Sequence, residues 1–248
     1  MMRRVWITGG AKGIGRAIAE AFVAAGDSVL ITGRDEAALA AAAQALGESV
    51  DWRAMDVADE ASVQAGFAQE SRVDVLVNNA GVAGAAPVGR ESVEQWDRMM
   101  AVNARGVFLC SRAALALMQP AGTGRILCIA STASHAGMAY ASAYTASKHA
   151  ALGFMRSLAS ELAGSQITAN SICPTYVDTE MTQRSIQNIQ QKTGKSTAEA
   201  RAMLEKGSPL GRLVRPDEIA AAALYLASPE AGAINGQSLI LDGGGIQS

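Results

Sequence analysis

Short apolar runs alternate along the chain with longer stretches in which apolar residues recur every three or four positions. The short runs predict seven β-strands, at about residues 5–7, 28–32, 51–55, 73–77, 125–129, 166–172 and 237–241. The longer stretches predict helices at about residues 14–25, 36–46, 60–69, 93–119 and 142–163. Strands that alternate with helices favour right-handed crossovers and a parallel sheet covered on both faces. We therefore expect an α/β fold, a Rossmann-type doubly wound parallel sheet in which residues 1–248 form a single domain.

The composition narrows the class of protein. Apolar residues make up 49% of the chain and aromatic residues only 4%, so the core is expected to consist mainly of Ala, Val, Leu and Ile. A net charge of −2 gives no electrostatic footprint for nucleic acid. Cys110, Cys128 and Cys173 are widely spaced and lack metal-ligand spacing, so we expect reduced thiols and no metal. The sequence shows no signal peptide and no uninterrupted run of about 20 apolar residues, which predicts a soluble cytoplasmic protein without a membrane segment.

A glycine-rich turn follows the first predicted strand. The run Thr8-Gly9-Gly10-Ala11-Lys12-Gly13-Ile14-Gly15 separates that strand from the first predicted helix. Glycines let the backbone turn sharply and let a pyrophosphate approach a helix N-terminus, where free N–H groups and the helix dipole favour anions. This turn is therefore predicted to bind a dinucleotide coenzyme, through Thr8, Gly9, Lys12, Gly13, Ile14 and Gly15.

The residues after the second predicted strand bear on which dinucleotide fits. A carboxylate there typically binds the ribose hydroxyls of NAD(H), whereas the 2′-phosphate of NADP(H) needs a cation. The strand ends in the uncharged Gly33, Arg34 follows at once, and Lys12 is within reach of the same phosphate. These residues favour NADP(H). NAD(H) is the alternative, with Asp35 as the acidic partner of the ribose and the two cations as ordinary surface charges.

Two further strand ends are predicted to contribute to the coenzyme site. Asp56 and Val57 follow the third predicted strand and are expected to contact the adenine. The run Asn78-Asn79-Ala80-Gly81 follows the fourth strand and offers small residues where a flat coenzyme must pass. Because ligands bind outside the carboxyl ends of parallel strands, we assign Asn79, Ala80 and Gly81 to the coenzyme crevice.

Tyr144 and Lys148 are four residues apart within a predicted helix. A helix places residues at this spacing on one face, so the phenol and the ammonium are expected to lie side by side. A neighbouring positive charge favours the phenolate form of a tyrosine, which makes the residue usable as a proton donor and acceptor. A packed ring beside a solvated charge is the alternative interpretation of the pair taken alone.

Together these features make the chain resemble the short-chain dehydrogenase/reductase family over essentially its whole length. The resemblance rests on the glycine-rich turn, the run from Asn78 to Gly81, Asn103, Ser131 and the pair Tyr144 and Lys148. It implies that Tyr144 exchanges a proton with the substrate oxygen, that Lys148 supports it and holds the nicotinamide ribose, and that Ser131 hydrogen-bonds the substrate. Asn103 would kink its helix and hold a water that links Lys148 to solvent.

The resemblance also assigns residues that follow the sixth predicted strand. Pro174, Val177 and Thr179 are expected to contact the nicotinamide. Thr175 stands where the family usually has glycine, and its side chain is expected to narrow the space beside the ring. This departure concerns the shape of the substrate pocket and not the proton-transfer residues.

A long polar segment, at about residues 181–210, is predicted to form a lid over the substrate, with a solvated connection as the alternative. Ser196 or Thr197 would cap a short helix at about 198–206 with Glu199 in its first turn. Lys192 and Lys195 would meet the phosphates of a coenzyme A or carrier-protein thioester, if they are more than solvated side chains. Further candidates for the pocket are His135, Met138, Tyr176 and Met181.

The expected function is an NAD(P)-dependent interconversion of a secondary alcohol and a ketone. The overall pattern resembles 3-oxoacyl thioester reductases and 3-hydroxyacyl dehydrogenases, and a sugar, polyol, cyclic alcohol or steroid substrate is the alternative. An inactive coenzyme-binding scaffold subunit would be expected to lack Ser131, Tyr144 or Lys148, and all three are present. By family analogy the protein forms a homotetramer, with the last strand and helix 142–163 at subunit interfaces.

Overall fold

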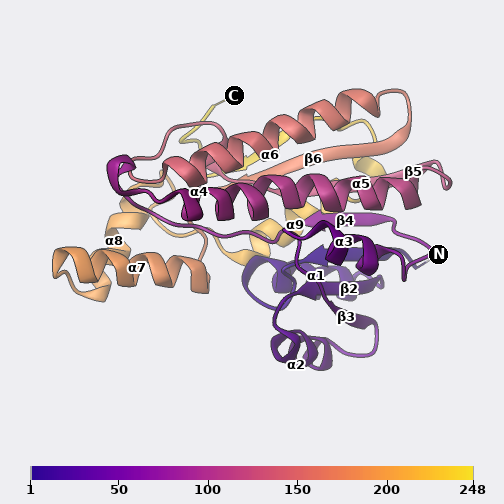
Figure 1. The fold of residues 1–248 in the computed structure, drawn as a ribbon, viewed down its shortest axis with the longest axis horizontal. Helices are drawn as coiled ribbons and strands as arrows, with labels where there is room; N and C mark the ends of the chain where they lie inside the picture. Colours follow the sequence, from indigo (N-terminus) through magenta and orange to yellow (C-terminus); the bar gives the residue numbers. More distant parts are fainter. Residues whose placement is uncertain (1, 248) are drawn as a thin grey trace.

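The structure, a computed structural model, describes residues 2–247 and contains a seven-stranded parallel sheet (Figure 1). The strands are β1 (Arg4–Thr8), β2 (Ser28–Gly33), β3 (Val50–Ala54), β4 (Val75–Asn78), β5 (Thr123–Ile129), β6 (Gln166–Pro174) and β7 (Ser238–Leu241). Their order across the sheet is β3-β2-β1-β4-β5-β6-β7, and every neighbouring pair is parallel. The predicted α/β fold and all seven predicted strands are confirmed, with bounds that differ by one to two residues.

Helices cover both faces of the sheet, as predicted. The helices are α1 (Gly13–Ala24), α2 (Glu36–Leu46), α3 (Glu60–Phe67), α4 (Val93–Met100), α5 (Gly106–Met118), α6 (Ser142–Glu161), α7 (Glu180–Thr193), α8 (Thr197–Lys206) and α9 (Pro216–Leu226). On one face α3, α5 and α6 pack on the sheet through residues such as Phe67, Met118 and Met155. On the other face α1, α2 and α9 do so through residues such as Phe22 and Leu39. Strands buried on both faces explain the short, nearly continuous apolar runs of the sequence.

The sequence predicts one long helix at 93–119, and the structure corrects this prediction. Between α4 and α5 the backbone forms a π-helical turn, Ala101–Arg105, which contains the buried Asn103. Wide turns of this kind occur frequently at functional sites, because they re-aim a side chain without ending the helix. The helix axis therefore continues, while Asn103 faces a direction that regular α-helical periodicity does not give.

The segment Val93–Met118 is also long and apolar enough to cross a membrane by length and composition alone, with a mean hydropathy of 1.2 in its most apolar window. Core helices of water-soluble proteins meet the same criteria. Here Cys110, Ala114 and Met118 belong to the hydrophobic core, and α5 packs against β4 and β5. Burial in the core accounts for part of the apolar character of this segment, since 39% of the window is buried.

Helices α7 and α8 stand apart from the sheet, at the opposite end of the molecule from the N-terminus (Figure 1). They have a small core of their own, in which Ile186, Ala200, Leu204 and Leu213 are buried. The predicted cap of α8 is confirmed: Ser196 accepts from the amide of Glu199, and the Glu199 carboxylate accepts from the amide of Ser196. Helix α7 was not predicted, because its sequence is mostly polar.

Candidate active site

The strand order reverses between β1 and β4, and this point defines the crevice of the site. The chain leaves β1 toward α1 on one face and leaves β4 toward α4 on the other, so their loops diverge at the carboxyl edge. The amides of Gly9 and Gly10 both donate to the carbonyl oxygen of Thr32, at 2.7 and 3.4 Å. The glycine-rich turn is thereby fixed beside the end of β2, where Gly33 and Arg34 follow.

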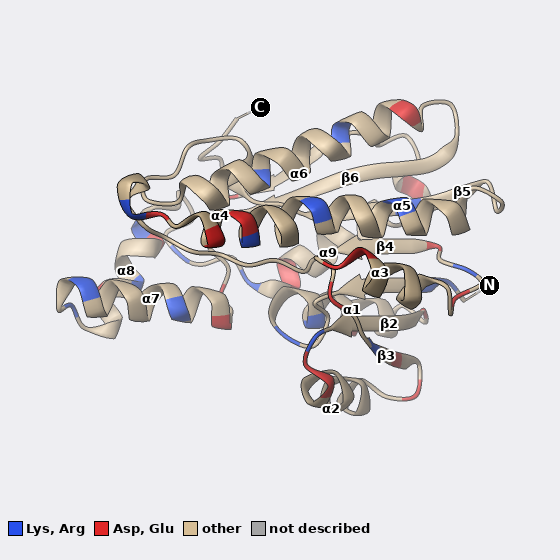
Figure 2. Ribbon diagram, in the orientation of Figure 1, with Lys and Arg blue, Asp and Glu red and all other residues tan. Residues whose placement is uncertain are grey.

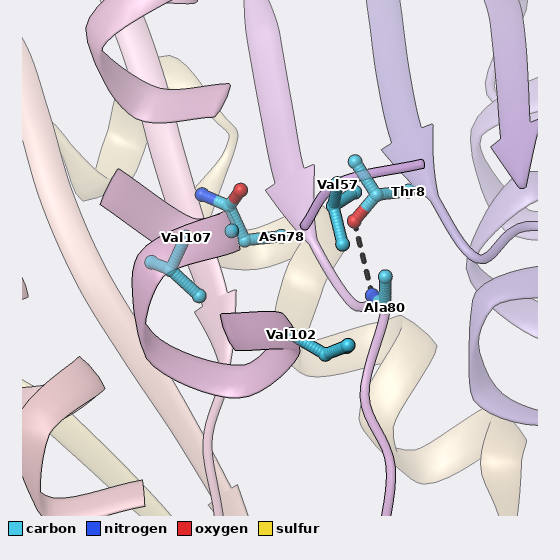
Figure 3. Close-up of a pocket in the computed structure, with 7 residues that line it drawn as sticks. Thr8, Val57, Asn78, Ala80, Val102 and Val107 are labelled. Carbon is cyan, nitrogen blue, oxygen red and sulfur yellow. Dashed lines mark hydrogen bonds between the residues drawn. The ribbon is translucent and has the colours of Figure 1, made fainter. Parts of the chain in front are cut away.

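Thr8 and Asn79 join the ends of β1 and β4. The hydroxyl of Thr8 accepts from the amides of Asn79 and Ala80, both at 3.0 Å. The amide side chain of Asn79 donates to the carbonyls of Thr8 and Gly9. Figure 3 shows the Thr8–Ala80 bond beside a small internal void that Val57, Val102 and Val107 also line. In this structure these polar groups bind each other, so they tie the end of β1 to the segment that follows β4.

Two glycines of the glycine-rich turn are restricted, one by its backbone conformation and one by close packing. Gly13, the first residue of α1, has φ of +55°, a left-handed conformation that favours glycine. A Cβ at Gly15 would lie 2.4 Å from the carbonyl oxygen of Gly9 and 2.4 Å from the Asn79 side chain. Lys12, at the N-cap of α1, makes no side-chain cap hydrogen bond. The start of α1 is therefore a compact backbone surface, suited to an anion.

Both cations predicted for a 2′-phosphate lie next to carboxylates. Arg34 Nη1 is 3.9 Å from Asp56 Oδ2, and both side chains are partly exposed. Lys12 Nζ is 3.0 Å from Glu180 Oε2, at the first residue of α7. Asp35 does not face this group of charges as a free carboxylate, since it accepts from the amide of Ala38 and caps α2. The alternative role of Asp35 as the acidic reader of NAD(H) would compete with that cap.

Lys148 is buried, and its ammonium is held by the main chain. Its Nζ donates to the carbonyl oxygen of Ile129 at 2.9 Å, at the end of β5. The same Nζ lies 5.8 Å from the ring centroid of Tyr144, so the predicted pair shares one face of α6. Ser131 follows β5 and is 8% exposed; its hydroxyl accepts from the amide of Ala133 at 3.1 Å. Helix α6 packs against the turn that Ser131 begins, Thr132–Ser134, which brings the two segments together.

Asn103 binds directly to neighbouring segments in the structure. Its side-chain oxygen accepts from the amide of Val82 at 2.8 Å, and its nitrogen donates to the Val82 carbonyl and to the Ser147 hydroxyl. Ser147 in turn donates to the carbonyl of Tyr144. A Cβ at Gly81 would lie 3.4 Å from Asn103 Oδ1 and 3.8 Å from Lys148 Nζ. The π-helical turn thus places Asn103 beside Gly81 and next to the first turns of α6, the helix that carries Tyr144 and Lys148.

The segment that follows β6 lies close to the glycine-rich turn. Pro174 ends β6, Val177 is buried, and Thr179 precedes α7. A Cβ added at Gly13 would lie 3.5 Å from the Thr179 methyl group. The amide of Thr175 donates to the carbonyl of Leu241, so the backbone after β6 is fixed by β7. The structure therefore places Thr179 beside the glycine-rich turn, whereas Val177 belongs to the core and pairs with Val214; their contacts with the nicotinamide stay a prediction.

The remaining candidate residues of the substrate pocket differ in their burial. Burial raises the pKa of Tyr176, and the nearby Tyr144 raises it further, so the two phenols lie close to one another. Burial lowers the pKa of His135, and Arg156 and His149 add to the effect. Met181 is 43% exposed and open to solvent. Lys192, in the last turn of α7, and Lys195, in the loop that follows α7, are both exposed.

The sequence did not reveal two residues that contact the candidate site, Ser147 and Glu180. Ser147 lies within the motif that carries Tyr144 and Lys148, but serine at that place gives no signal of a bond to Asn103. Glu180 pairs with Lys12 across 168 positions, 180 minus 12, and no local pattern reveals that contact. Among residues 2–247 no group of three or more His, Cys, Asp or Glu side chains could hold a metal ion. Burial raises the pKa of the Cys128 thiol to about 11 and that of Cys173 to about 12.

Known proteins with related sequences match nearly the whole chain. A family model described as Enoyl-(Acyl carrier protein) reductase matches residues 9–245. D-threitol dehydrogenase of Mycolicibacterium smegmatis is 40% identical over 245 residues, which cover 96% of this chain and 90% of that protein. The 3-oxoacyl-(acyl-carrier-protein) reductase FabG of Vibrio harveyi is 34% identical over 242 residues, covering 96% and 95%. A solved variant of actinorhodin polyketide ketoreductase with NADPH has a TM-score of 0.95 at 35% identity, covering 98% of this chain and 97% of that one.

Proposed function

Because the chain belongs to the short-chain dehydrogenase/reductase family, whose members are NAD(P)-dependent oxidoreductases acting on CH–OH groups, we propose that it interconverts a secondary alcohol and a ketone at Ser131, Tyr144 and Lys148. The observation that carries this proposal is the geometry around Lys148. Its buried ammonium is fixed to the Ile129 carbonyl, two residues before Ser131, and stands beside the Tyr144 ring. Burying a cation costs free energy. A role for Lys148 in proton transfer explains why a lysine is buried at this place.

In the proposed mechanism Tyr144 gives its phenolic proton to the carbonyl oxygen during reduction and takes it back during oxidation. The Lys148 ammonium stabilises the negative charge that the phenol oxygen then carries. The Ser131 hydroxyl orients the substrate oxygen, while its own oxygen is fixed by the amide of Ala133. Asn103 fixes the start of α6 through its hydrogen bond to Ser147. The nicotinamide coenzyme supplies or accepts the hydride.

We propose NADP(H) as the preferred coenzyme. The support is Arg34 directly after β2 and Lys12 in the glycine-rich turn, whose Gly9 is bonded to Thr32 of β2, together with Asp35 serving as a helix cap instead of a free carboxylate. A Cβ at Gly33 would make only ordinary contacts with Leu39, at 3.7 Å or more. The structure therefore has space for an acidic side chain at residue 33. Because glycine stands there instead, this space is free for the 2′-phosphate.

Replacement of Arg34 by alanine tests this preference. Arg34→Ala is expected to weaken NADPH binding about tenfold, because a charge-assisted contact to phosphate is lost, while NADH binding changes little. Coenzyme fluorescence titration measures both dissociation constants. Arg16→Ala is the matched control, since Arg16 is also an exposed arginine of the coenzyme half and pairs with Glu20. Equal losses of the two coenzymes would contradict the proposal.

For the substrate we propose a 3-oxoacyl thioester or its 3-hydroxyacyl counterpart. The support is the similarity to the FabG reductase and to D-beta-hydroxybutyrate dehydrogenase of Cupriavidus necator, at 34% and 36% identity. Lys192 and Lys195 would meet the phosphates of the thioester carrier. A polyol is the second candidate, favoured by the 40% identity to D-threitol dehydrogenase.

Turnover of a substrate panel separates these functions. The panel holds acetoacetyl thioesters, D-threitol and other polyols, cyclic ketones and steroids, each with both coenzymes. The thioester is expected to give the highest kcat/KM, with NADPH. Preference for D-threitol would overturn the thioester proposal and keep the dehydrogenase, whereas coenzyme binding without any turnover would support a scaffold subunit.

The proposal extends to the organisation of the enzyme. We propose a single coenzyme-binding and catalytic domain, a lid at about 181–210 and a cytoplasmic homotetramer. Exposed apolar residues support the assembly: Trp96 on α4 and Phe108 on α5 are 41% and 39% exposed, and Leu239 on the edge strand β7 is 37% exposed. Association of these faces would cover both the helices and the sheet edge.

A further inference from the structure

One ion pair connects the glycine-rich turn to the proposed lid. Lys12 stands at the start of α1 and Glu180 at the start of α7, and their charged atoms are 3.0 Å apart. The two backbones are close as well, since a Cβ at Gly13 would lie 3.5 Å from Thr179. Figure 2 shows the acidic residue at this end of α7 and basic residues further along it. The lid thus presents a carboxylate to the cation that the proposed coenzyme site needs.

We propose that Glu180 competes with the 2′-phosphate of the coenzyme for Lys12, and that Glu180 is therefore a determinant of coenzyme preference. This inference rests on the proposed NADP(H) site. When NADP(H) binds, Lys12 leaves Glu180 for the phosphate. When NAD(H) binds, the Lys12–Glu180 pair stays intact and α7 stays attached to the glycine-rich turn.

The exposure of the pair makes this exchange feasible. The side chains of Lys12 and Glu180 are 60% and 64% exposed, and ion pairs in water at this exposure contribute little to stability. A phosphate monoester carries nearly two negative charges at neutral pH and three strong acceptor oxygens, so it is the stronger partner for a lysine. Glu180 keeps a favourable place after release, because a carboxylate in the first turn of α7 is stabilised by the helix dipole.

The small core of α7 and α8, together with a second ion pair, keeps the lid in place when the first pair opens. Arg201 on α8 donates to the carboxylate of Asp178, with Nη2 2.8 Å from Oδ2. Release of Glu180 therefore loosens only the start of α7. Linkage makes the effect reciprocal: if a 2′-phosphate loosens this end of the lid, an attached lid opposes the 2′-phosphate to the same extent.

The variant Glu180→Gln tests the competition without activity as the readout. We expect its NADPH dissociation constant to fall about two- to fivefold, the range that an exposed ion pair supports, while that of NADH stays constant. Fluorescence titration measures both. Glu20→Gln is the matched control, because Glu20 is also an exposed carboxylate paired with a cation of α1, Arg16, and it should change neither constant. The Glu180→Gln effect should vanish in a Lys12→Met background, as a double-mutant cycle requires.

Each result decides a different statement. Equal tightening of both coenzymes would mean that Lys12 serves the shared pyrophosphate, and no tightening would mean that Glu180 does not compete; either result overturns the inference. If Arg34→Ala and Lys12→Met weaken NADPH selectively while Glu180→Gln has no effect, the proposed coenzyme stands and only the inference fails. If neither cation matters, the NADP(H) proposal itself fails.

Hydrogen exchange gives an independent readout. In the wild-type protein, amides near the start of α7 should exchange faster with NADPH bound than with NADH bound. In Glu180→Gln the two complexes should exchange alike, while residues of α8 behave as in the wild type. Identical exchange at α7 in both wild-type complexes would contradict the coupling.

Discussion

The proposed proton-transfer cluster (Asn103, Ser131, Tyr144 and Lys148) and the proposed lid, helices α7 and α8, are held in place by different interactions. Asn103, Ser131 and Lys148 are buried and Tyr144 is partly exposed, and polar atoms of Lys148 and Asn103 bind main-chain groups, the Ile129 carbonyl and the Val82 amide. The lid is held by exposed ion pairs, Lys12–Glu180 and Arg201–Asp178, and by a small core of its own. Main-chain bonds in a dry site fix position, whereas exposed ion pairs exchange partners easily. The fold thus fixes the proposed proton-transfer residues in place and leaves α7 and α8 more adjustable.

The largest expected effect is the loss of Tyr144 from the rigid side of this comparison. Tyr144→Phe keeps the ring and its packing but removes the proton, so kcat should fall about 100- to 10,000-fold. Coenzyme binding by fluorescence should be nearly unchanged, because the Lys148–Ile129 bond does not involve the hydroxyl. A variant with full turnover would refute Tyr144 as the proton donor and leave the cluster without its assigned chemistry.

The tight packing of the glycine-rich turn gives a second, smaller effect. Gly15→Ala should destabilise the protein by about 1–3 kcal/mol, because its Cβ would overlap the Gly9 carbonyl. The control is Gly153→Ala in α6, where a Cβ meets no atom within 4 Å. That change should stabilise the protein by about 0.5–1 kcal/mol, since alanine is the better helix former. Urea denaturation measures both, and equal effects would show that the turn is not tightly packed.

The smallest expected effect lies in the lid and depends on pH. The hydrogen bond from Arg201 lowers the pKa of Asp178 below its ordinary 3.8. A lowered carboxyl pKa stabilises the folded state above the ordinary value, and this stabilisation is lost as the pH falls through the lowered pKa. The pair is partly exposed, so we expect only about 0.2–1 kcal/mol.

Proteolysis of the lid between pH 7 and pH 3 provides the measurement. In the wild-type protein, cleavage within α7 and α8 should increase as the pH falls below about 4, relative to cleavage elsewhere. In Asp178→Asn the lid should already be more susceptible at pH 7 and should show a weaker pH dependence. Lid cleavage that is independent of both pH and Asp178 would show that the small core alone holds these helices.

The sequence predicts the rigid half of the molecule better than the adjustable half. Buried parallel strands must be apolar, so their number and approximate bounds are visible in the sequence, and the i, i+4 spacing places Tyr144 beside Lys148 as expected. The cap of α8 is also a local signal: the sequence predicts Ser196 or Thr197, and the structure shows Ser196. The catalytic roles of these residues stay predictions until the variants above are measured.

Interactions between distant segments were not predictable. The π-helical turn exists where Asn103 binds Val82 and Ser147, which a periodicity of 3.6 residues cannot show. Helix α7 buries mainly Thr182 and Ile186, too few apolar positions for a helical pattern. The sequence offers Asp35 only as the acidic partner of NAD(H), and the bond from Ala38 identifies it as a helix cap.

The pairing of β7 has a consequence for how the enzyme is made. Residues Ser238–Leu241 pair with Ser171–Pro174, and the Leu241 carbonyl fixes the amide of Thr175 beside the crevice. Strands β1 to β5 and helix α6 can associate while the ribosome is still at work, but the backbone that carries Val177 and Thr179 waits for β7 to be synthesised. Contacts of such long sequence separation form late. Catalytic competence should therefore appear in a nascent chain only after β7 has left the exit tunnel, as the final event of folding.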